Sequence, residues 1–231
     1  MTLDEFKQHN AITFNNDALL NQAFIHRSFI NENPRSGLEH NERLEFLGDA
    51  VLELVVTEYL YTNYPHHNEG DLTSYRSALV NAVTLGEVAD SLSFNGMLKL
   101  SKGEAKDVSR ARSSILADAY EAFVGALYLD QGYEHAKEFI ARTVLIKTDD
   151  IVRKGLYRDA KSFVQEKSQE LFGITPVYKV LQEEGPDHDK RFVVGIYFSD
   201  ECIAEGIGKS KQEAETSAAR GALEKKGWVS K

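Results

Sequence analysis

The amino-acid sequence predicts two domains of different class, an all-α domain followed by an α+β domain with the element order α-β-β-β-α. Apolar residues recur at spacings of three and four up to about residue 146, which is the period of amphipathic helices. The period falls to two within residues 177–207, as expected for half-buried strands. A highly charged stretch with little apolar periodicity lies between these regions. We therefore predict a helical domain at 1–146, a linker at 147–159 and an α+β domain at 160–228.

Helical periodicity in the first domain is clearest in three long segments. These segments are residues 41–61, 71–91 and 113–130. Ser113 and Ser114 are of the type that caps a helix N-terminus, so they are candidate caps of the third segment. Gly132, directly after that segment, offers a glycine stop, because glycine adopts the left-handed conformation that ends many helices.

The α+β domain is predicted to begin with a helix at 160–172, ended by Gly173. Three strands follow, at Val177–Glu183, Arg191–Ser199 and Glu201–Ile207, and a last helix runs over Ser210–Lys226. Two sets of apolar residues are expected to form its core, one on the second strand and one on the last helix. They are Phe192, Val194, Ile196 and Phe198, and Ala214, Ala218, Ala219, Ala222 and Leu223.

Charge is distributed unequally between the two domains. The 231 residues include 27 Lys and Arg against 36 Asp and Glu, for a net charge of −9. Residues 1–157 hold 15 basic against 23 acidic residues, net −8, whereas residues 158–231 hold 12 against 13, net −1. Because the acidic excess lies in the helical domain, the negative total does not exclude a nucleic-acid partner for the second domain.

Several classes of protein are disfavoured by composition. Cys202 is the single cysteine, so neither an internal disulfide nor a cysteine zinc site is expected. The sequence contains no apolar run of about 18 residues, and its start lacks the basic and apolar regions of a signal peptide. We therefore predict a cytoplasmic protein without a membrane partner.

One face of the segment NERLEFLGDAVLELV, residues 41–55, is acidic. At 100° per residue, four carboxylates fall on a single helix face: Glu42, Glu45, Asp49 and Glu53. Like charges at these spacings repel one another and destabilise a solvated helix. The opposite face carries apolar residues expected to enter the core, namely Leu44, Leu47, Val51 and Leu54. Gly48 would allow a second backbone or a ligand to approach closely.

A second acidic pair occurs in SSILADAYEAFVGALYLD, residues 113–130. Asp118 and Glu121 are three residues apart on one face, which continues to Gly125. If the two acidic faces packed together, they would gather four carboxylates around one point. Hard oxygen ligands without His or Cys suit Mg²⁺ or Mn²⁺ rather than zinc. The alternative is that both acidic faces are simply solvated.

Several motifs in the chain resemble those of the ribonuclease III family. NERLEFLGD resembles the family's signature stretch, and LADAYEAFVGALYLD is similar to its second acidic helix. HHNEGDLTSYRSALVN and AFIHRSF also match the family's pattern, and the motifs stand in the family's order along nearly the whole chain. The resemblance implies an all-α nuclease domain followed by a double-stranded-RNA-binding domain.

The resemblance also implies the chemistry of the site. Glu45, Asp118 and Glu121 match the family's Mg²⁺ ligands, with Mn²⁺ a possible substitute, and Asp49 and Glu121 match its catalytic carboxylates. The implied enzyme is a homodimer that uses no nucleotide cofactor and cleaves both strands of double-stranded RNA. Its products carry 5′ phosphates and 3′ hydroxyls with two-nucleotide 3′ overhangs, and its expected role is the processing of ribosomal, messenger and other structured RNA precursors.

Further residues of the helical domain have less specific expected roles. Glu42 and Glu69 match accessory positions linked to the dimer interface and substrate, with capping or solvated charge as the alternative. Arg76 and Lys102 could contact phosphates or only balance charge. His26 is expected to be structural, as a packed or capping residue, because carboxylates already suffice for the chemistry. Two further residues are assigned either to dimer surface or, as the safer interpretation, to monomer core: Phe46 and Leu47.

The second domain carries polar residues suited to an RNA duplex. DAKSFVQEKSQELFG resembles the first helix of a double-stranded-RNA-binding domain, with four side chains placed to reach 2′-hydroxyls in a minor groove: Ser162, Gln165, Glu166 and Gln169. His188 lies in the loop expected to enter a second minor groove, and Lys209 and Lys211 are expected to contact phosphates. Gln212 departs from the family pattern, which usually has a second lysine there; Lys209, Arg220 or Lys225 could compensate.

Two other functional classes remain open. The chain could be a dimeric double-stranded-RNA-binding protein that does not cleave, although all four carboxylates of the implied site are present. A more distant alternative is another Mg²⁺-dependent helical phosphohydrolase, which the second domain disfavours. Each of the polar residues singled out in the second domain, taken alone, is better explained as a solvated surface side chain, whereas together they favour RNA binding.

Overall fold

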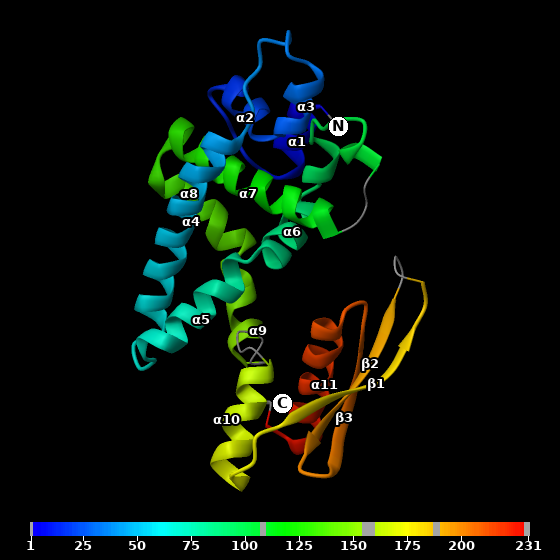
Figure 1. Cartoon of the computed structure of the whole chain (residues 1–231). Helices are drawn as coiled ribbons and strands as arrows, with labels where there is room; N and C mark the ends of the chain where they lie inside the picture. The colour runs from blue at the N-terminus through cyan, green and yellow to red at the C-terminus, as the bar shows by residue number, and fades with distance from the viewer. Residues whose placement is uncertain (1, 107–109, 154–159, 187–189, 229–231) are drawn as a thin grey trace. The chain divides into compact units, whose positions relative to one another are not determined.

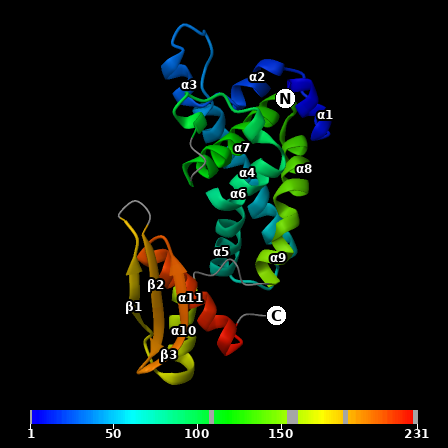
Figure 2. The same ribbon diagram turned by 90° about the vertical axis from the view of Figure 1, so that its right-hand side faces the viewer.

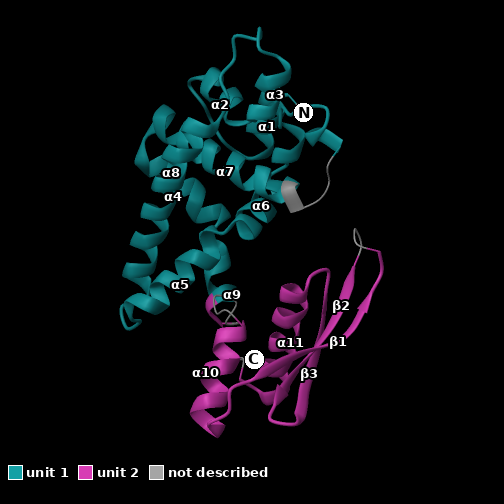
Figure 3. Ribbon diagram, viewed as in Figure 1, with its two compact units in different colours: residues 1–151 teal, residues 152–231 magenta. Residues whose placement is uncertain are grey.

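A computed structural model describes residues 2–106, 110–153, 160–186 and 190–228. The chain forms two compact units, residues 1–151 and 152–231 (Figure 3). The first is helical, and the second combines two helices with a three-stranded sheet, so the predicted fold class is confirmed. Within the described ranges, no helix has both the length and the apolar composition needed to cross a bilayer.

The first unit consists of α-helices joined by short loops and 3-10 turns (Figures 1 and 2). Its α-helices are α1 (Leu3–His9), α2 (Asp17–Ala23), α3 (Arg27–Glu32), α4 (Glu42–Asn63), α5 (Glu69–Val80), α6 (Ala82–Ser91), α7 (Arg110–Gln131), α8 (Tyr133–Thr143) and α9 (Thr148–Arg153). Single 3-10 turns occur at η1 (Phe94–Gly96), η2 (Glu104–Lys106) and η3 (Leu145–Lys147). Buried aromatic side chains form much of the core, where Phe6 packs edge-on against Phe24 at 5.1 Å and Phe94 at 5.4 Å.

The two long helices α4 and α7 cross at glycines. A Cβ atom on Gly48 would lie 1.7 Å from the carbonyl oxygen of Glu121, and one on Gly125 would lie 2.2 Å from that of Leu44. Any side chain at either position would therefore push the helices apart. The close approach predicted for Gly48 is confirmed, and the approaching group is another backbone.

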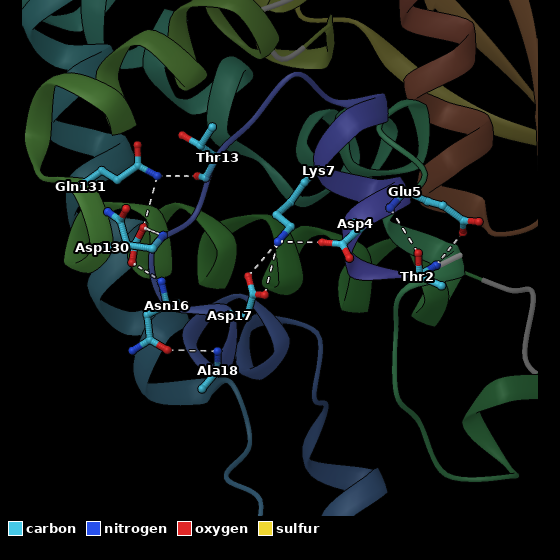
Figure 4. Close-up of polar contacts among 11 residues, drawn as sticks. Thr2, Asp4, Glu5, Lys7, Thr13, Asn16, Asp17, Ala18, Asp130 and Gln131 are labelled. Carbon is cyan, nitrogen blue, oxygen red and sulfur yellow. Dashed lines mark hydrogen bonds and ion pairs between the residues drawn. The ribbon is translucent and has the colours of Figure 1, made fainter.

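The N-terminal segment is fastened to the C-terminal end of α7 by polar contacts (Figure 4). The Asp130 carboxylate accepts hydrogen bonds from the backbone N–H groups of Asn15 and Asn16, both at 2.8 Å. The Gln131 amide donates to the carbonyl of Thr13. Gly132 follows with a φ of +84°, so the predicted glycine stop is confirmed.

The predicted helix at 71–91 is wrong in one respect, because the structure divides it into α5 and α6. Asn81 adopts an extended conformation between them, with φ −72° and ψ 157°. Its side-chain oxygen accepts a hydrogen bond from the backbone N–H of Thr84, and its amide donates to the carbonyl of Ala78 at 2.9 Å. Asparagine therefore caps the second helix at the break, an outcome that apolar spacing alone does not reveal.

The capping role predicted for Ser113 and Ser114 is also wrong. Described residues of α7 begin at Arg110, which places both serines inside the helix. Ser113 instead lies at the contact with α6, where a Cβ atom on Gly86 would be 2.4 Å from the Ser113 hydroxyl oxygen. Glycine at position 86 and a small side chain at position 113 are needed because α6 and α7 approach closely at this contact.

Residues 147–153 differ from the linker predicted at 147–159. Most of them form α9, in which the apolar side chain of Ile151 is 6% exposed and Thr148 is fully buried. The Thr148 hydroxyl donates to the carbonyl of Leu145 at 2.7 Å. One buried turn provides too few apolar residues for a visible periodicity, which explains why the sequence pattern misses it. The rest of the predicted linker, residues 154–159, lies outside the described ranges.

The second unit contains α10 (Ala160–Phe172), β1 (Val177–Glu184), β2 (Arg191–Phe198), β3 (Glu201–Gly208) and α11 (Lys211–Lys226). The strands form an antiparallel sheet in the order β1-β2-β3. All the residues predicted for its core on β2 and α11 are buried. Trp228 stacks on Phe198 at 5.9 Å, which gives it a packing role. Gly173 ends α10 with a φ of +67°, as predicted. Ser210, where the last helix was predicted to begin, is the residue that caps α11.

Candidate functional site

A cluster of three carboxylates forms where α4 and α7 cross. Glu45 lies on α4, and Asp118 and Glu121 lie one turn apart on α7. One carboxylate oxygen from each residue lies within 4.8 Å of those from the other two. The cluster is next to the glycine contact, since Glu121 supplies the carbonyl oxygen that faces Gly48. The glycines thus allow the acidic faces of the two helices to meet.

All three carboxyl groups are harder to ionise than ordinary carboxyl groups. Burial, together with the charges of Asp118, Glu42 and Asp49, raises the pKa of Glu45 to about 7. Burial also raises the pKa of Glu121 to about 8, with repulsion from Asp49 as its largest charge contribution. The pKa of Asp118 is raised chiefly by burial. The protein alone therefore leaves this cluster electrostatically unsatisfied.

The side chains present fit a hard divalent cation. Carboxylate oxygens are the ligands that Mg²⁺, Mn²⁺ and Ca²⁺ prefer, and an ion between them would offset both the repulsion and the desolvation that raise their pKa values. Strongly perturbed carboxyl groups gathered in one place are typical of functional sites. The cluster is consequently a candidate metal site, and the alternative of plainly solvated faces does not account for the half-buried positions of its three members.

Asp49 occupies a different position from the other three predicted carboxylates. It is exposed, one turn after Glu45 on α4, and it lies outside the set of mutually close oxygens. Its charge nevertheless acts on both Glu45 and Glu121. The structure thus gathers three carboxylates and places the fourth at their edge, and the catalytic role of Asp49 stays a prediction.

The accessory acidic residues lie outside the cluster. The Glu42 carboxylate forms an ion pair with Arg27 at 3.4 Å. Glu69 is the first residue of α5 and accepts a hydrogen bond from the Thr73 hydroxyl at 3.2 Å. Arg76 donates to the hydroxyl of Thr57 at 3.1 Å. Glu69 and Arg76 line the same surface hollow between α4 and α5, so both remain candidates for substrate contact.

His26 has the capping role that the sequence predicts. Its Nδ1 accepts a hydrogen bond from the backbone N–H of Ser28 at the start of α3 and lies 2.8 Å from the Ser28 hydroxyl. The Ser28 hydroxyl oxygen also accepts from the backbone N–H of Ser101 at 3.0 Å. An electrostatic interaction with His26 partly offsets the burial that raises the pKa of Asp118. Lys102, in the following loop, is exposed.

Asn41 is a residue of the site region that the sequence patterns did not single out. It precedes α4 and is 2% exposed, and its side-chain amide donates to the carbonyl of Ala23 at 3.1 Å. An asparagine before a helix normally indicates a helix cap. The residue type therefore drew attention to this position, but it indicated a capping bond and not the observed bond to Ala23.

The second unit presents its predicted RNA-binding residues to solvent. Ser162, Gln165, Glu166 and Gln169 are all exposed along α10. Lys209 and Lys211 are exposed at the start of α11, where the Lys211 ammonium lies 3.9 Å from the Glu183 carboxylate. Gln212, Arg220 and Lys225 are exposed on the same helix. His188 lies outside the described residues. Exposure makes these contacts available, and their roles stay predictions.

Comparisons with known proteins match both units. The chain matches the family model described as Ribonuclease-III-like over residues 16–148, and that of the double-stranded RNA binding motif over residues 160–226. Ribonuclease 3 of Anoxybacillus flavithermus is 45% identical over 224 residues, which cover 96% of this chain and 92% of that relative. Ribonuclease 3 of Geobacillus thermodenitrificans is 45% identical over 220 residues, covering 95% and 89% respectively.

A solved structure agrees with these matches. The nuclease domain of ribonuclease III from Campylobacter jejuni superposes with a TM-score of 0.56 and 38% identity, over 62% of this chain and 96% of that one; its structure concerns flexibility in a region involved in dimer formation. Fold and site together define a helical nuclease with an appended double-stranded-RNA-binding domain. The chain belongs to the ribonuclease III family, as its motifs predicted.

Proposed function

We propose that this protein is a Mg²⁺-dependent endoribonuclease that cleaves both strands of double-stranded RNA as a homodimer. Its products would carry 5′ phosphates and 3′ hydroxyls with two-nucleotide 3′ overhangs, and Mn²⁺ would substitute for Mg²⁺. Its cellular work would be the processing of ribosomal and other structured RNA precursors in the cytoplasm. The carboxylate cluster at the crossing of α4 and α7 is the single observation that carries the catalytic part of this proposal.

The cluster supplies what phosphodiester hydrolysis requires from the protein. Glu45, Asp118 and Glu121 would hold divalent metal through their oxygens, and Asp49 would act as a further catalytic carboxylate from the edge of the site. When bound, such an ion neutralises phosphate charge, activates water and stabilises the leaving 3′ oxygen. Without a cation, the ionised carboxylates would repel the anionic RNA backbone. They also repel one another, which contributes to the raised pKa of Glu121.

The second unit would hold the duplex. Its exposed polar row on α10 suits hydrogen bonds to 2′-hydroxyls across a wide, shallow minor groove. Lys209 and Lys211 at the N-terminal end of α11 suit phosphate contacts, which position the duplex without reading its sequence. His188 is proposed for a second minor groove. Recognition of this kind depends on A-form shape, so we expect RNA duplexes to be preferred over DNA.

An apolar row on α4 supports the homodimer. Phe46 is 82% exposed, Leu54 57% and Tyr61 76%, at spacings of eight and seven residues that place them on one side of the helix. The core position predicted for Leu54 is therefore wrong, and so is monomer core as the safer interpretation of Phe46; Leu47 is half-buried. Phe46 and Leu47 also line a surface hollow of about 600 Å³ together with Leu129. An exposed apolar row of this kind is typical of an interaction surface.

Cleavage of defined nucleic acids tests the proposal. End-labelled RNA duplex of about 40 base pairs, duplex DNA and single-stranded RNA are incubated with Mg²⁺ or EDTA. We expect Mg²⁺-dependent cleavage of both strands of the RNA duplex only, with ends offset by two nucleotides. Glu121→Gln is expected to abolish cleavage and retain a gel shift on the duplex. Glu134→Gln, which changes an exposed glutamate of α8 in the same way, is expected to cleave like wild type.

Two outcomes would contradict the proposal. If the folded wild-type protein shifted the duplex but did not cleave it with Mg²⁺ or Mn²⁺, the binding-only function would be favoured. If Glu121→Gln lost duplex binding together with cleavage, the assignment of cleavage to the carboxylate cluster and of duplex binding to the second unit would be wrong.

A further inference from the structure

The N-terminal boundary of α4 differs from most other helix starts within the described residues. At six α-helices the residue before the first turn accepts a hydrogen bond with its side chain from its own helix. These residues are Thr2, Asn16, His26, Asn68, Asn81 and Ser210. Asn41 precedes α4 and is of a residue type favoured for this role, yet its side chain makes no such bond. The amide of Asn41 is therefore used for something other than capping.

Asn41 connects α4 to the segment that joins α2 to α3. Its side-chain amide donates to the carbonyl of Ala23 at 3.1 Å, and its backbone N–H donates to the carbonyl of Ile25 at 2.9 Å. With 2% of its surface exposed, water cannot replace these bonds at low cost. Its own carbonyl accepts from the backbone N–H of Leu44 at 2.8 Å and of Glu45 at 2.9 Å. One residue thus links the joining segment directly to the backbone of Glu45.

The segment to which Asn41 binds is itself firmly placed. Ala23, Phe24 and Ile25 are at most 1% exposed. The backbone N–H of Lys99 donates to the carbonyl of Phe24 at 2.8 Å, and that of His26 donates to the carbonyl of Lys99 at 3.1 Å. The segment can therefore serve as a fixed reference for the first turn of α4.

Glu45 needs such a restraint because its neighbours repel it. Its carboxylate lies close to those of Asp118 and Glu121, and like charges this close favour any movement that separates them. The glycine contacts at Gly48 and Gly125 fix the distance between α4 and α7, but they hold the first turn of α4 only against α7. The bonds of Asn41 act at that turn.

We propose that Asn41 is a positioning residue of the carboxylate cluster, holding Glu45 in place for a divalent cation through the joining segment. The inference rests on the proposed function in taking the cluster as the metal site. Partners that hold metal ligands in place typically contribute about 10- to 100-fold to metal affinity. Loss of the Asn41 amide should therefore weaken metal binding much more than it weakens duplex binding.

The test uses Asn41→Ser and Asn41→Asp in the full-length protein. Both replacements are good helix caps, but the hydroxyl of serine is too short to reach Ala23 and the carboxylate of aspartate has no proton to donate. Asn10→Ser is the matched control, because Asn10 is 5% exposed and its amide also joins distant segments, with bonds to the carbonyls of Phe6 and Leu92. Those bonds involve neither α4 nor α7.

Binding of Mn²⁺ without RNA is measured by titration calorimetry, and duplex binding is measured in EDTA. We expect both Asn41 variants to raise the dissociation constant for Mn²⁺ by about tenfold or more, with duplex affinity within about twofold of wild type. Asn10→Ser should lower the melting temperature and leave Mn²⁺ binding unchanged. Cleavage by the Asn41 variants should recover as the metal concentration is raised.

The possible results separate this inference from the proposed function. If either folded Asn41 variant bound Mn²⁺ like wild type, or if Asn10→Ser weakened Mn²⁺ binding as much, the positioning role would be refuted while the metal site stood. Glu121→Gln is included for the site itself: if it bound Mn²⁺ as wild type does, the cluster would not be the metal site and both ideas would fail.

Discussion

Gly48→Ala perturbs the contact that brings α4 and α7 together at the carboxylate cluster. The new Cβ atom would lie 1.7 Å from the Glu121 carbonyl oxygen and 2.8 Å from the backbone nitrogen of Gly125. Separations below 3.0 Å are essentially not found for such atoms, so the helices must move apart by at least about 1.3 Å. Backbone atoms of a helix interior cannot rotate away as a flexible side chain can. The displacement must therefore carry the cluster residue Glu121 away from α4.

Two measurable consequences follow from that displacement. In an isolated helix, alanine is favoured over glycine by about 1 kcal/mol, so the substitution should stabilise the protein if no contact opposed it. Overpacking of this kind instead costs about 1–3 kcal/mol, and we expect a net loss of unfolding free energy. Misplacement of catalytic groups by about 1 Å reduces rates by roughly 100-fold. Cleavage of an RNA duplex should therefore fall by about that factor at saturating Mg²⁺.

Urea unfolding and single-turnover cleavage measure the two effects. Gly96→Ala is the matched control, because a Cβ atom there has no heavy atom within 4 Å and the position does not require a positive φ. It should leave both quantities near their wild-type values. A folded Gly48→Ala protein with wild-type cleavage and wild-type stability would refute the argument that this glycine sets the geometry of the cluster.

Three further results are expected. Burial and neighbouring charges raise the pKa values of Glu45 and Glu121 to about 7 and about 8, so in EDTA the folded protein should bind more protons than the unfolded chain. The melting temperature should therefore fall as pH rises from about 5 to 8. Glu121→Gln should reduce that fall. Lys209→Ala with Lys211→Ala should weaken duplex binding and make the slope of log affinity against log salt less steep by about one per lost phosphate contact. Phe46→Glu, which places a charge on the apolar row of α4, should convert the proposed homodimer to a monomer in sedimentation experiments.

Each of these results has a contradicting outcome. A melting temperature that rises with pH over that range in EDTA would show that the buried carboxyl groups do not dominate the titration. Lysine variants with an unchanged salt slope would show that those side chains do not contact phosphates. Ile146→Glu is the control for Phe46, since Ile146 is 70% exposed outside α4; equal loss of dimer in both variants would argue against an interface on that helix.

Helix boundaries show where sequence patterns were sufficient and where they failed. The last helix was predicted well because Ser210 caps it locally and its alanines recur at helical spacing. The break at Asn81 was missed because the apolar pattern continues across it, and only the bonds of one side chain divide the helices. In α9, burial of Thr148 and Ile151 depends on tertiary packing, which spacing within the segment cannot reveal.

The site was predictable to a similar extent. Acidic residues at helical spacing indicated Glu45, Asp118 and Glu121, and the structure brings these three together. The same spacing placed Asp49 with them, but the crossing leaves it exposed at the edge. Leu54 was expected in the core and is 57% exposed, because α4 turns that side toward neither α7 nor the rest of the core.

By itself, the sequence determined the two-domain class, the family, the carboxylates with their flanking glycines, and the exposed polar row of the second unit, because each is a local pattern on one element. The tertiary structure alone decided that α4 and α7, far apart in the chain, meet at Gly48 and Gly125, and that burial there raises the pKa values of Glu45 and Glu121. It also directed the Asn41 amide away from its own helix. Periodicity specifies which residues share a face, whereas only packing selects which faces meet.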